Sequence, residues 1–584
     1  MHPPASPLSR SQGYVLVTAL MAMILLTFMV TIYMITSLNS PRTVRSQADS
    51  LGGFLAAEGG LSMRAALIRD KFVGFERPTG TACPPSAVSG GGGDFACVPY
   101  TFSERTVRTG VRETTTTPDG DSGTVAEGER YAGLSYQQYS YRVTSEARQG
   151  DVRQATVQME FQSRLVPLFQ FAAFYNQDLE INPGPNMTLN GRVHTNGNLY
   201  LSPGDRLNIS GQVSAQNSIF RNRKDSGACS GTVQFRSGAA LGCGVGQLSA
   251  AQLALYGGNV NSNQPKLDVP AMGSLDPDPL GGAGNELWTK ADLRFVAVAS
   301  SGCIGGYCLQ VQDSRGVIDA VATSALNTNP TCLGAVLVTS TLYDAREGKT
   351  MTLMDVNQQR LMDCIQLTPS GTFKDSALQP VRMDNTTQGG LVFHFSFFPP
   401  ANNLGLRVQN AAALGTTLGV QPVGLTIATP QPIYVRGNYN VTNKVPASLL
   451  GDAINVLSGD WLDSDKTAST SDVNGILLKA APTTINAAFL SGIVPTSGSN
   501  YSGGLENYPR FHENWTNVPF TYSGSFVSLG VSRYGTGRWV GGGNRYEAPL
   551  RDWSFDETFK NASKLPPLSP RFVYLRQLFF AREF

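Results

Sequence analysis

Residues 189–200, LNGRVHTNGNLY, and residues 209–220, ISGQVSAQNSIF, are two versions of one pattern at an offset of 20 residues. Apolar residues coincide at 189/209, 193/213 and 199/219, and glycine coincides at 191/211. A period of about 20 residues, with short strands and Gly or Asn corners, is typical of a β-solenoid, in which each coil buries its aliphatic residues against the next. The two segments therefore predict stacked parallel strands.

Similar short apolar strands, separated by Gly, Asn and Ser, recur towards the end of the chain. They begin near Leu425, Pro432, Ala453, Thr484 and Gly524. Strands of this length with Gly and Asn punctuation indicate that the solenoid resumes there. Nearer the N-terminus, the alternating segments 139–144 and 155–161 predict a β-hairpin. The aromatic tail from Phe572 is expected to be a closing strand docked on the body.

The bulk composition excludes an electrostatic nucleic-acid interface. Only 15% of the 584 residues are charged, and the formal net charge is +2. A protein that binds a phosphate backbone concentrates Lys and Arg on one face, and no such excess is present. We expect no nucleic-acid contact from charge.

All eight cysteines lie after the hydrophobic N-terminal segment. Their spacing favours four local disulfides. Paired cysteines are typical of an oxidising compartment, so we expect the body to lie outside the cytoplasm. The expected pairs are Cys83–Cys97, Cys229–Cys243, Cys303–Cys308 and Cys332–Cys364. The spacing of Cys303 and Cys308 also occurs in metal sites, but no second pair or histidine is near, so we expect no metal.

Residues 14–38, YVLVTALMAMILLTFMVTIYMITSL, contain no charged residue. As a helix this segment extends about 37 Å at 1.5 Å per residue, which is enough to cross a hydrocarbon core of about 30 Å. It is longer than the apolar region of a cleaved secretory signal. A transmembrane helix is therefore expected, and a plain signal anchor with a stalk is the simplest alternative.

The helix is expected to continue beyond the membrane to residue 72. Small and apolar residues recur there at spacings of three and four, and small residues let helices approach closely. The residues expected to pack against other helices are Thr18, Val44, Ala48, Leu51, Leu55 and Glu58, within a stripe that extends to Ala66.

Gly13-Tyr14, followed by the long apolar run, resembles the N-terminus of a type IV prepilin, and Leu55-Ala56-Ala57-Glu58 resembles the helix of PilX-type minor pilins. The resemblance implies that a prepilin peptidase cleaves between Gly13 and Tyr14 and that Tyr14 becomes N-methylated. Pilins usually carry Glu at the fifth mature position, where this chain has Thr18. That departure favours a tip or initiator subunit over a repeating one.

Several segments of the body resemble a domain of uncharacterised pilus-assembly proteins that share this N-terminus. They cover about two-thirds of the chain and begin at Asn182, Arg436, Gly451, Ala487, Glu513 and Tyr522.

Candidates for catalysis are few. The chain has four histidines, His2, His194, His394 and His512. His194 aligns with Ser214 in the repeat, which indicates a hydrogen-bonded corner rather than a catalytic base. His512 and Glu513 are adjacent, so on a strand they point to opposite faces. The acidic cluster Asp463, Asp465 and Asp472 lacks the remaining ligands of a calcium loop. We expect no enzyme activity, no catalytic residue, no cofactor and no metal.

The expected fold class is mainly β, with a long transmembrane, pilin-like N-terminal helix and a large β-solenoid-like body with a disulfide-stapled insertion. The expected segments are a prepilin-type leader (1–13), the helix (14–72), a loop and hairpin region (73–165), the solenoid start (166–224), an inserted Cys-rich region (225–420) and the solenoid continuation with the closing strand (421–584).

The function expected is a structural, minor pilin-like subunit of a type IV pilus-like machine, serving for example adhesion. Its expected partners are other pilins, minor pilins and the prepilin peptidase. It is expected in the inner membrane before assembly, with the body extracytoplasmic, and in a cell-surface pilus afterwards. Two alternatives stay open: an anchored surface solenoid that binds glycans or envelope components outside any pilus, and a carbohydrate-active enzyme.

Overall fold

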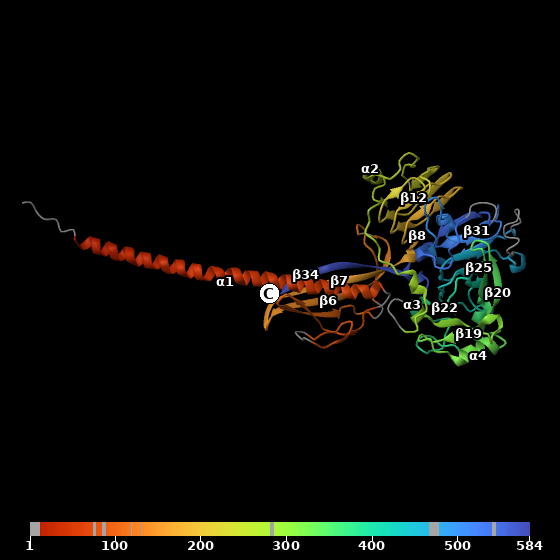
Figure 1. Ribbon diagram of the computed structural model, residues 1–584, viewed down its shortest axis with the longest axis horizontal. Coiled ribbons are helices and arrows are strands. Elements are labelled where there is room, and N and C mark those ends of the chain that lie inside the picture. Colours follow the sequence, from red (N-terminus) through yellow and green to blue (C-terminus); the bar gives the residue numbers. More distant parts are fainter. Residues whose placement is uncertain are drawn as a thin grey trace, which may run out of the picture.

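The computed structural model describes residues 12–73, 77–84, 89–117, 120–129, 131–236, 238–280, 285–465, 478–539 and 545–583. The chain forms a long helix, an antiparallel sheet beside the C-terminal part of that helix, and a large body of mostly parallel sheets (Figure 1). The predicted mainly β class with an N-terminal apolar helix is confirmed.

Helix α1 (Gln12–Val73) has two environments along its length. Its N-terminal half projects away from the rest of the protein, and its C-terminal half lies along an antiparallel sheet (Figure 1). The uncharged run of Leu, Met, Ala and Ile favours helix in the first half. In the second half the helix also buries one face against the sheet.

The antiparallel sheet has six strands in the order β3-β4-β6-β7-β34, with β5 beside β6. Its strands are β3 (Val98–Phe102), β4 (Arg105–Glu113), β5 (Asp121–Thr124), β6 (Ser135–Gln149), β7 (Val152–Pro167) and β34 (Arg571–Glu583). The predicted hairpin is confirmed by β6 and β7, in which Tyr141 pairs with Phe161. Two short strands, β1 (Gly80–Thr81) and β2 (Gly92–Gly93), pair separately.

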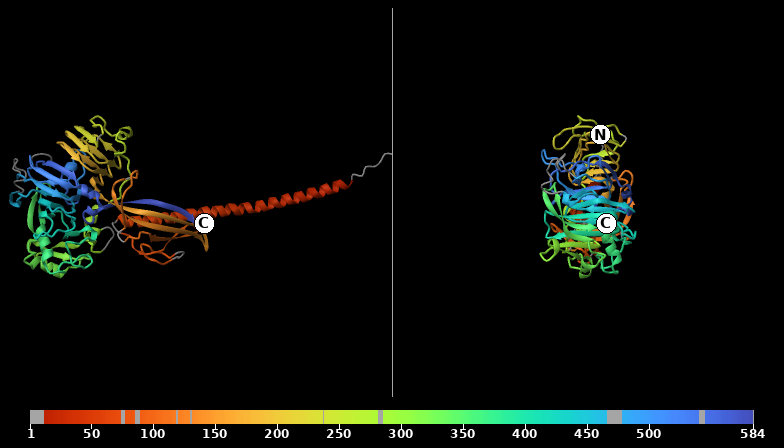
Figure 2. Two further views of the ribbon diagram at one scale, coloured as in Figure 1. Left: turned by 180° about the vertical axis from the view of Figure 1, so that it is seen from behind. Right: turned by 90° about the vertical axis from the view of Figure 1, so that its right-hand side faces the viewer.

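The C-terminal strand β34 pairs with β7 along its length and lies beside α1, as Figure 2 shows from behind. The strand was expected to dock on the body, and only its first residues do so: the ring of Phe572 packs 6.3 Å from that of Phe171 on β8. Phe572 and Val573 are buried, and Val573 joins the core between α1 and the sheet. The chain thus returns from the body to complete the sheet that begins after α1.

In the first part of the body, each turn of the chain contributes one strand to each of three parallel sheets. The strands are β8 (Phe171–Tyr175), β9 (Leu179–Ile181), β10 (Met187–Leu189), β11 (Arg192–Thr195), β12 (Leu199–Leu201), β13 (Arg206–Ile209), β14 (Val213–Ala215), β15 (Ile219–Phe220), β16 (Thr232–Phe235) and β17 (Val260–Asn261).

The predicted register of 20 residues is confirmed, since the three apolar pairs anticipated from the sequence are all partners in parallel ladders. Leu189 pairs with Ile209, Val193 with Val213 and Leu199 with Ile219. These side chains are buried in one cluster, which a single turn could not have enclosed alone. The wider β-solenoid assignment stays a prediction, and the parallel register agrees with it.

One of these three sheets, the one that contains β17, β14, β11 and β8, continues into the second part of the body and has eleven strands in all. Its strands there are β18 (Leu293–Ala299), β19 (Tyr307–Gln312), β22 (Leu391–Phe398), β24 (Leu425–Ala428), β26 (Ala447–Leu450), β29 (Ala488–Ile493) and β32 (Phe526–Val531). Strand β32 pairs with β8, where Phe526 is the partner of Ala173. The chain therefore begins in the middle of this sheet, winds to one end, crosses to the other end and winds back to the start.

A nine-stranded sheet covers the second part. It contains β20 (Val336–Asp344), β21 (Lys349–Asn357), β23 (Leu404–Ala413), β25 (Ile433–Thr442), β27 (Ile454–Leu457), β28 (Thr483–Asn486), β30 (Pro509–Phe511), β31 (Pro519–Gly524) and β33 (Leu550–Phe555). Residues 225–420 were expected to be an insertion, but they supply strands to both large sheets. Two of these strands, β18 and β22, are apolar enough to be buried on both faces.

Short helices connect these strands. They are α2 (Ala250–Ala254), α3 (Glu286–Thr289), α4 (Ala320–Thr328) and α5 (Gln358–Leu367), with the 3₁₀ turns η1 (Leu168–Gln170), η2 (Met272–Leu275), η3 (Ile304–Gly306), η4 (Thr387–Gly389), η5 (Asp463–Asp465), η6 (Leu505–Asn507), η7 (Glu557–Lys560) and η8 (Ala562–Lys564).

The four disulfides are those predicted from spacing. They join Cys83 to Cys97, Cys229 to Cys243, Cys303 to Cys308 and Cys332 to Cys364. Each closes a local loop, which restricts the unfolded chain and orders the segment between its ends.

Candidate functional site

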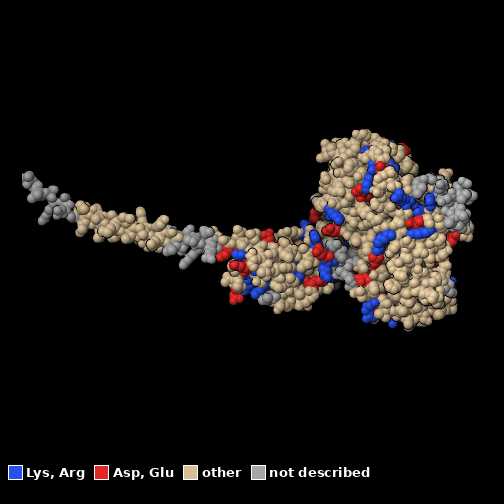
Figure 3. Space-filling model, in the orientation of Figure 1, with Lys and Arg blue, Asp and Glu red and all other residues tan. Residues whose placement is uncertain are grey.

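The free half of α1 contains a segment long and apolar enough to cross a membrane, from Tyr14 to Ile35. None of it is buried within the protein, and no charged side chain marks it on the face shown in Figure 3. Thr18 sits in this segment, and its hydroxyl donates to the backbone oxygen of Tyr14 at 2.7 Å. Gly13 lies in the first turn of α1, while residues 1–11 lie outside the described residues.

The inner face of the second half of α1 is built from small and apolar residues. Ala57, Leu61 and Ile68 are buried in one cluster with the sheet. A methyl group on Gly60 would lie 2.5 Å from Cγ1 of Val107 on β4, so only glycine permits this approach of helix to sheet. This inner face was not predicted from the sequence, although its small and apolar residues recur at the helical spacing of three and four residues.

The outer face of the same half remains uncovered. Leu51 and Leu55 are 59% and 57% exposed, and Met63 and Leu67 are about half exposed. The predicted packing residues Ala48, Leu51, Leu55 and Glu58 are all on this outer face, and Thr18 is exposed further along the helix. The side chain of Val44 lies outside the described residues. The predicted stripe therefore does not pack on its own domain.

Strand β34 extends this apolar surface next to the helix. The ring of Phe580 packs edge-on against Phe54 of α1 at a centroid distance of 6.3 Å, and Arg582 donates to the hydroxyl of Ser50. Leu578, Phe579 and Phe580 are exposed on the outer part of the strand. The helix and the last strand are thus in contact, and their exposed apolar residues Leu51, Leu55, Leu578, Phe579 and Phe580 are called the α1–β34 surface.

The histidines described in the body are structural. The imidazole of His194 is buried, with Nδ1 2.7 Å from the hydroxyl of Ser214 and Nε2 3.2 Å from Oδ1 of Asn196. His394 is buried with Nε2 2.9 Å from the backbone oxygen of Leu275. Burial lowers the pKa of both to about 4, so both are neutral at physiological pH.

His512 and Glu513 have different hydrogen-bond partners. His512 Nε2 lies 2.9 Å from Oδ1 of Asn455, whereas the Glu513 carboxylate accepts hydrogen bonds from the backbone and hydroxyl of Ser458, each at 2.6 Å. His512 Nδ1 lies 3.8 Å from Oδ1 of Asp344. All of these groups are buried, so the neighbours in sequence serve two separate hydrogen-bond networks.

A buried ionic cluster was not anticipated from the sequence. Arg510 forms an ion pair with Glu347 at 2.5 Å, and the phenol of Tyr434 donates to Asp344 at 2.7 Å. Burial alone would raise the pKa of Asp344, but its interactions with His512 and Arg510 and the hydrogen bond from Tyr434 hold that pKa well below its usual range. The cluster ties β20 to β25 and β30.

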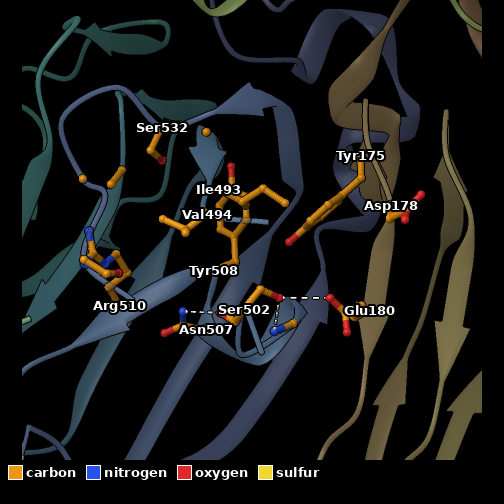
Figure 4. A pocket seen from close by; sticks show the side chains of 15 residues that line it. Tyr175, Asp178, Glu180, Ile493, Val494, Ser502, Asn507, Tyr508, Arg510 and Ser532 are labelled. Carbon is orange, nitrogen blue, oxygen red and sulfur yellow. Dashed lines mark hydrogen bonds between the residues drawn. The ribbon is translucent and has the colours of Figure 1, made fainter. Parts of the chain in front are cut away.

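The pocket in Figure 4 lies where the first and second parts of the body meet, between Tyr175, Tyr508 and Arg510. Its volume is about 30 Å³, which is room for roughly one water molecule. On its floor Ser502 donates to Glu180 at 3.2 Å, and Glu180 also accepts from Thr496. Both hydrogen bonds go to the same carboxylate oxygen, Oε1 of Glu180, and they link the first part of the body to the second.

Of the acidic cluster named from the sequence, Asp463 has a described side chain, whereas that of Asp465 lies outside the described residues. Asp463 accepts two hydrogen bonds from Arg407, at 2.7 and 2.8 Å, and Asp472 lies outside the described residues. Among the described residues, no group of three or more His, Cys, Asp or Glu side chains is arranged to hold a metal ion.

Comparisons with known proteins add little to this geometry. No protein-family model matches the chain, and no curated protein matches it. Among solved structures, the chain is similar to the competence-associated pilin ComZ from Thermus thermophilus, with 12% identity over 91% of this chain and 97% of that chain, at a TM-score of 0.25. A superposition this weak supports no argument about fold or function.

Proposed function

We propose that this protein is a structural, minor subunit of a type IV pilus-like machine, anchored through α1 and displaying its body outside the cytoplasm. The observation that carries the proposal is the division of α1 into two faces. One face of the helix packs against the six-stranded sheet of its own chain. On the other face, Leu51 and Leu55 are more than half exposed. An apolar surface of this kind on a helix that continues from a membrane segment favours packing against other helices.

The proposed assembly begins with α1 in the inner membrane. The prepilin-like N-terminus supports cleavage between Gly13 and Tyr14 by a prepilin peptidase, followed by N-methylation of Tyr14. Removing the leader leaves an apolar N-terminus that can move from lipid into a helical bundle. The four disulfides support an extracytoplasmic body, because such bonds persist in oxidising compartments.

A position at the tip, or in few copies, is part of the proposal. Thr18 stands where a pilin carboxylate is expected, and its hydroxyl bonds to its own helix at 2.7 Å, so it supplies no charge to pair with a neighbouring amine. The body also extends on both sides of the helix axis (Figure 1). A body of this width crowds its neighbours in a tightly packed filament. We assign no catalytic activity to it, and adhesion fits such a position.

The test is the N-terminal sequence and mass of the protein recovered from sheared cell-surface material. The proposal predicts a chain that begins at N-methylated Tyr14. Recovery of the full-length chain alone, beginning at Met1 and only in the membrane fraction, would refute processing as a pilin. The protein would then be an anchored surface protein.

A further inference from the structure

A cavity of about 320 Å³ opens among the loops of the body, separate from the α1–β34 surface. It lies between the loop after β9, the loop between β29 and β30, and the segment before β33. Its lining includes Asn182, Arg223, Tyr501, Glu506, Trp539 and Tyr546. Its volume is at the lower end of the range for small-molecule sites, so it can hold one or two sugar-sized rings.

Aromatic rings form one wall of the cavity and are held in fixed positions. Tyr501 and Trp539 pack edge to face with their centroids 5.1 Å apart. The indole N–H of Trp539 donates to the hydroxyl of Tyr546 at 2.8 Å, and Asn182 donates to the hydroxyl of Tyr501 at 3.1 Å. Tyr501 and Trp539 remain half-buried, so part of each ring faces the cavity. Rings fixed in this way offer apolar surface at little entropic cost.

The charges around the cavity balance. Arg223 stacks over the ring of Tyr501 at 4.1 Å and is paired with Asp225. Arg551 donates to the backbone oxygen of Glu506, and Glu547 completes the set of two arginines and two glutamates among the lining residues. An anion would face the glutamates and a cation would face the arginines. The lining therefore favours an uncharged ligand.

A hydrogen-bond acceptor in the wall is left without a donor. Glu506 is 7% exposed, and neither of its carboxyl oxygens receives a hydrogen bond of normal geometry from a described residue. Burial raises the pKa of Glu506 to about 7, while Arg551 and the nearby backbone amides of Asn182 and Glu506 oppose that rise. A buried acceptor without a partner costs free energy, so a ligand that brings hydroxyl groups is favoured over an apolar one.

We propose that this cavity binds a neutral oligosaccharide, with sugar rings stacked on Trp539 and Tyr501 and hydroxyl groups donating towards the polar wall. Sugars combine apolar C–H faces with many donors and no charge, which matches the lining in each respect. The inference does not depend on the proposed function, because an anchored surface protein would carry the same cavity. A failure of one therefore leaves the other standing.

The experiment uses the full chain in lauryldimethylamine oxide, since alkyl maltosides would bring sugar headgroups of their own. Maltohexaose, cellohexaose and chitohexaose are titrated while tryptophan emission is recorded, and binding is measured in parallel by calorimetry. Trp539 is half-buried, whereas Trp288, Trp461, Trp515 and Trp553 are buried. A sugar in the cavity therefore changes the emission chiefly through Trp539, whose indole ring forms the wall.

Two kinds of variant locate the binding. Trp539→Ala removes the ring, and Ala548→Trp adds bulk at an exposed lining position without removing a buried contact. Phe398→Ala is the matched control, because Phe398 is an exposed aromatic residue of another cavity. Circular dichroism establishes that each variant is folded.

The expected result is binding of at least one hexasaccharide that weakens at least tenfold in Trp539→Ala and Ala548→Trp and stays unchanged in Phe398→Ala. If Trp539→Ala fails to fold, Ala548→Trp alone decides the location. Binding of none of the three sugars overturns the proposal. Equal binding by the wild type and a folded Ala548→Trp variant overturns it as well.

Discussion

Replacing one leucine at a time on the two faces of α1 separates its internal role from its external one. Leu61 is 2% exposed and packs in the cluster between α1 and the six-stranded sheet. Truncation of such a buried leucine to alanine costs about 2–5 kcal/mol, because apolar contacts are lost and a cavity remains. Leu55 is 57% exposed, so the same truncation there should change stability by no more than about 0.5 kcal/mol.

Hydrogen exchange on the full chain in detergent measures this difference locally. A single free energy of unfolding is not well defined for a protein with separate sheets, whereas amide exchange reports each sheet by itself. We expect Leu61→Ala to accelerate exchange in the most protected amides of β6 and β7 by about 30-fold or more, since each 1.4 kcal/mol is a factor of ten. Exchange in the body should not change.

Leu55→Ala is the control in this comparison, and we expect wild-type exchange rates throughout. If Leu55→Ala loosens β6 and β7 as much as Leu61→Ala does, the outer face supports the domain and is not available to a partner. That result would remove the main support for the proposed function.

Three further predictions concern packing, pH and crosslinking. Gly60→Val should weaken the docking of α1, because even a methyl group there would lie 2.5 Å from Val107, and limited proteolysis within the second half of α1 should become faster than in wild type; unchanged proteolysis would refute the close approach. Burial raises the folded-state pKa of Glu506 to about 7, above its ordinary value of about 4.5, so the folded state loses stability as pH rises from about 4.5 through 7. Glu506→Gln should therefore leave the amide-exchange protection of β30 unchanged at pH 4.5 but raise it at pH 8, by up to about 3 kcal/mol; lower protection than in wild type at pH 8 would contradict the assignment. Replacing both Cys332 and Cys364 by alanine should speed amide exchange in α5, because that disulfide closes a separation of 32 residues and such links are typically worth about 2–4 kcal/mol; unaltered exchange in α5 would show that packing alone holds the helix.

Local patterns in the sequence predicted local parts of this fold. The pairing of Val193 with Val213 followed from residue types that repeat at one offset, and the hairpin at Gly150 followed from alternation around a turn. The disulfides followed from short separations. In each case the two partners are near in sequence, so the pattern itself contains both halves of the contact.

Contacts between distant segments could not be predicted in this way. The pairing of β8 with β32 joins Ala173 to Phe526, and β34 returns from the end of the chain to β7. Both depend on how whole sheets close, which leaves no periodic signal in either strand. The stripe on α1 was recognised, but its buried counterpart was not, because Gly60 reveals its role only when Val107 is placed against it.

The cavity lined by Tyr501 and Trp539 also depends on contacts between distant segments. Tyr501 and Trp539 come from different loops and meet across a contact of 5.1 Å. The only local signal was the aromatic residues placed beside the Gly-rich segments 503–504 and 541–543.

The most direct test of the central claim is photocrosslinking from the outer face of α1 in cells that assemble the machine. A photoreactive amino acid replaces Leu55, and in a matched control it replaces Leu255, which is 77% exposed on the body. If the outer face of α1 packs on other subunits, we expect the probe at residue 55 to crosslink to other pilin-like subunits in sheared surface material. We expect no such crosslink from the probe at residue 255. Equal crosslinking from both positions, or none from residue 55 in assembled material, would contradict that packing.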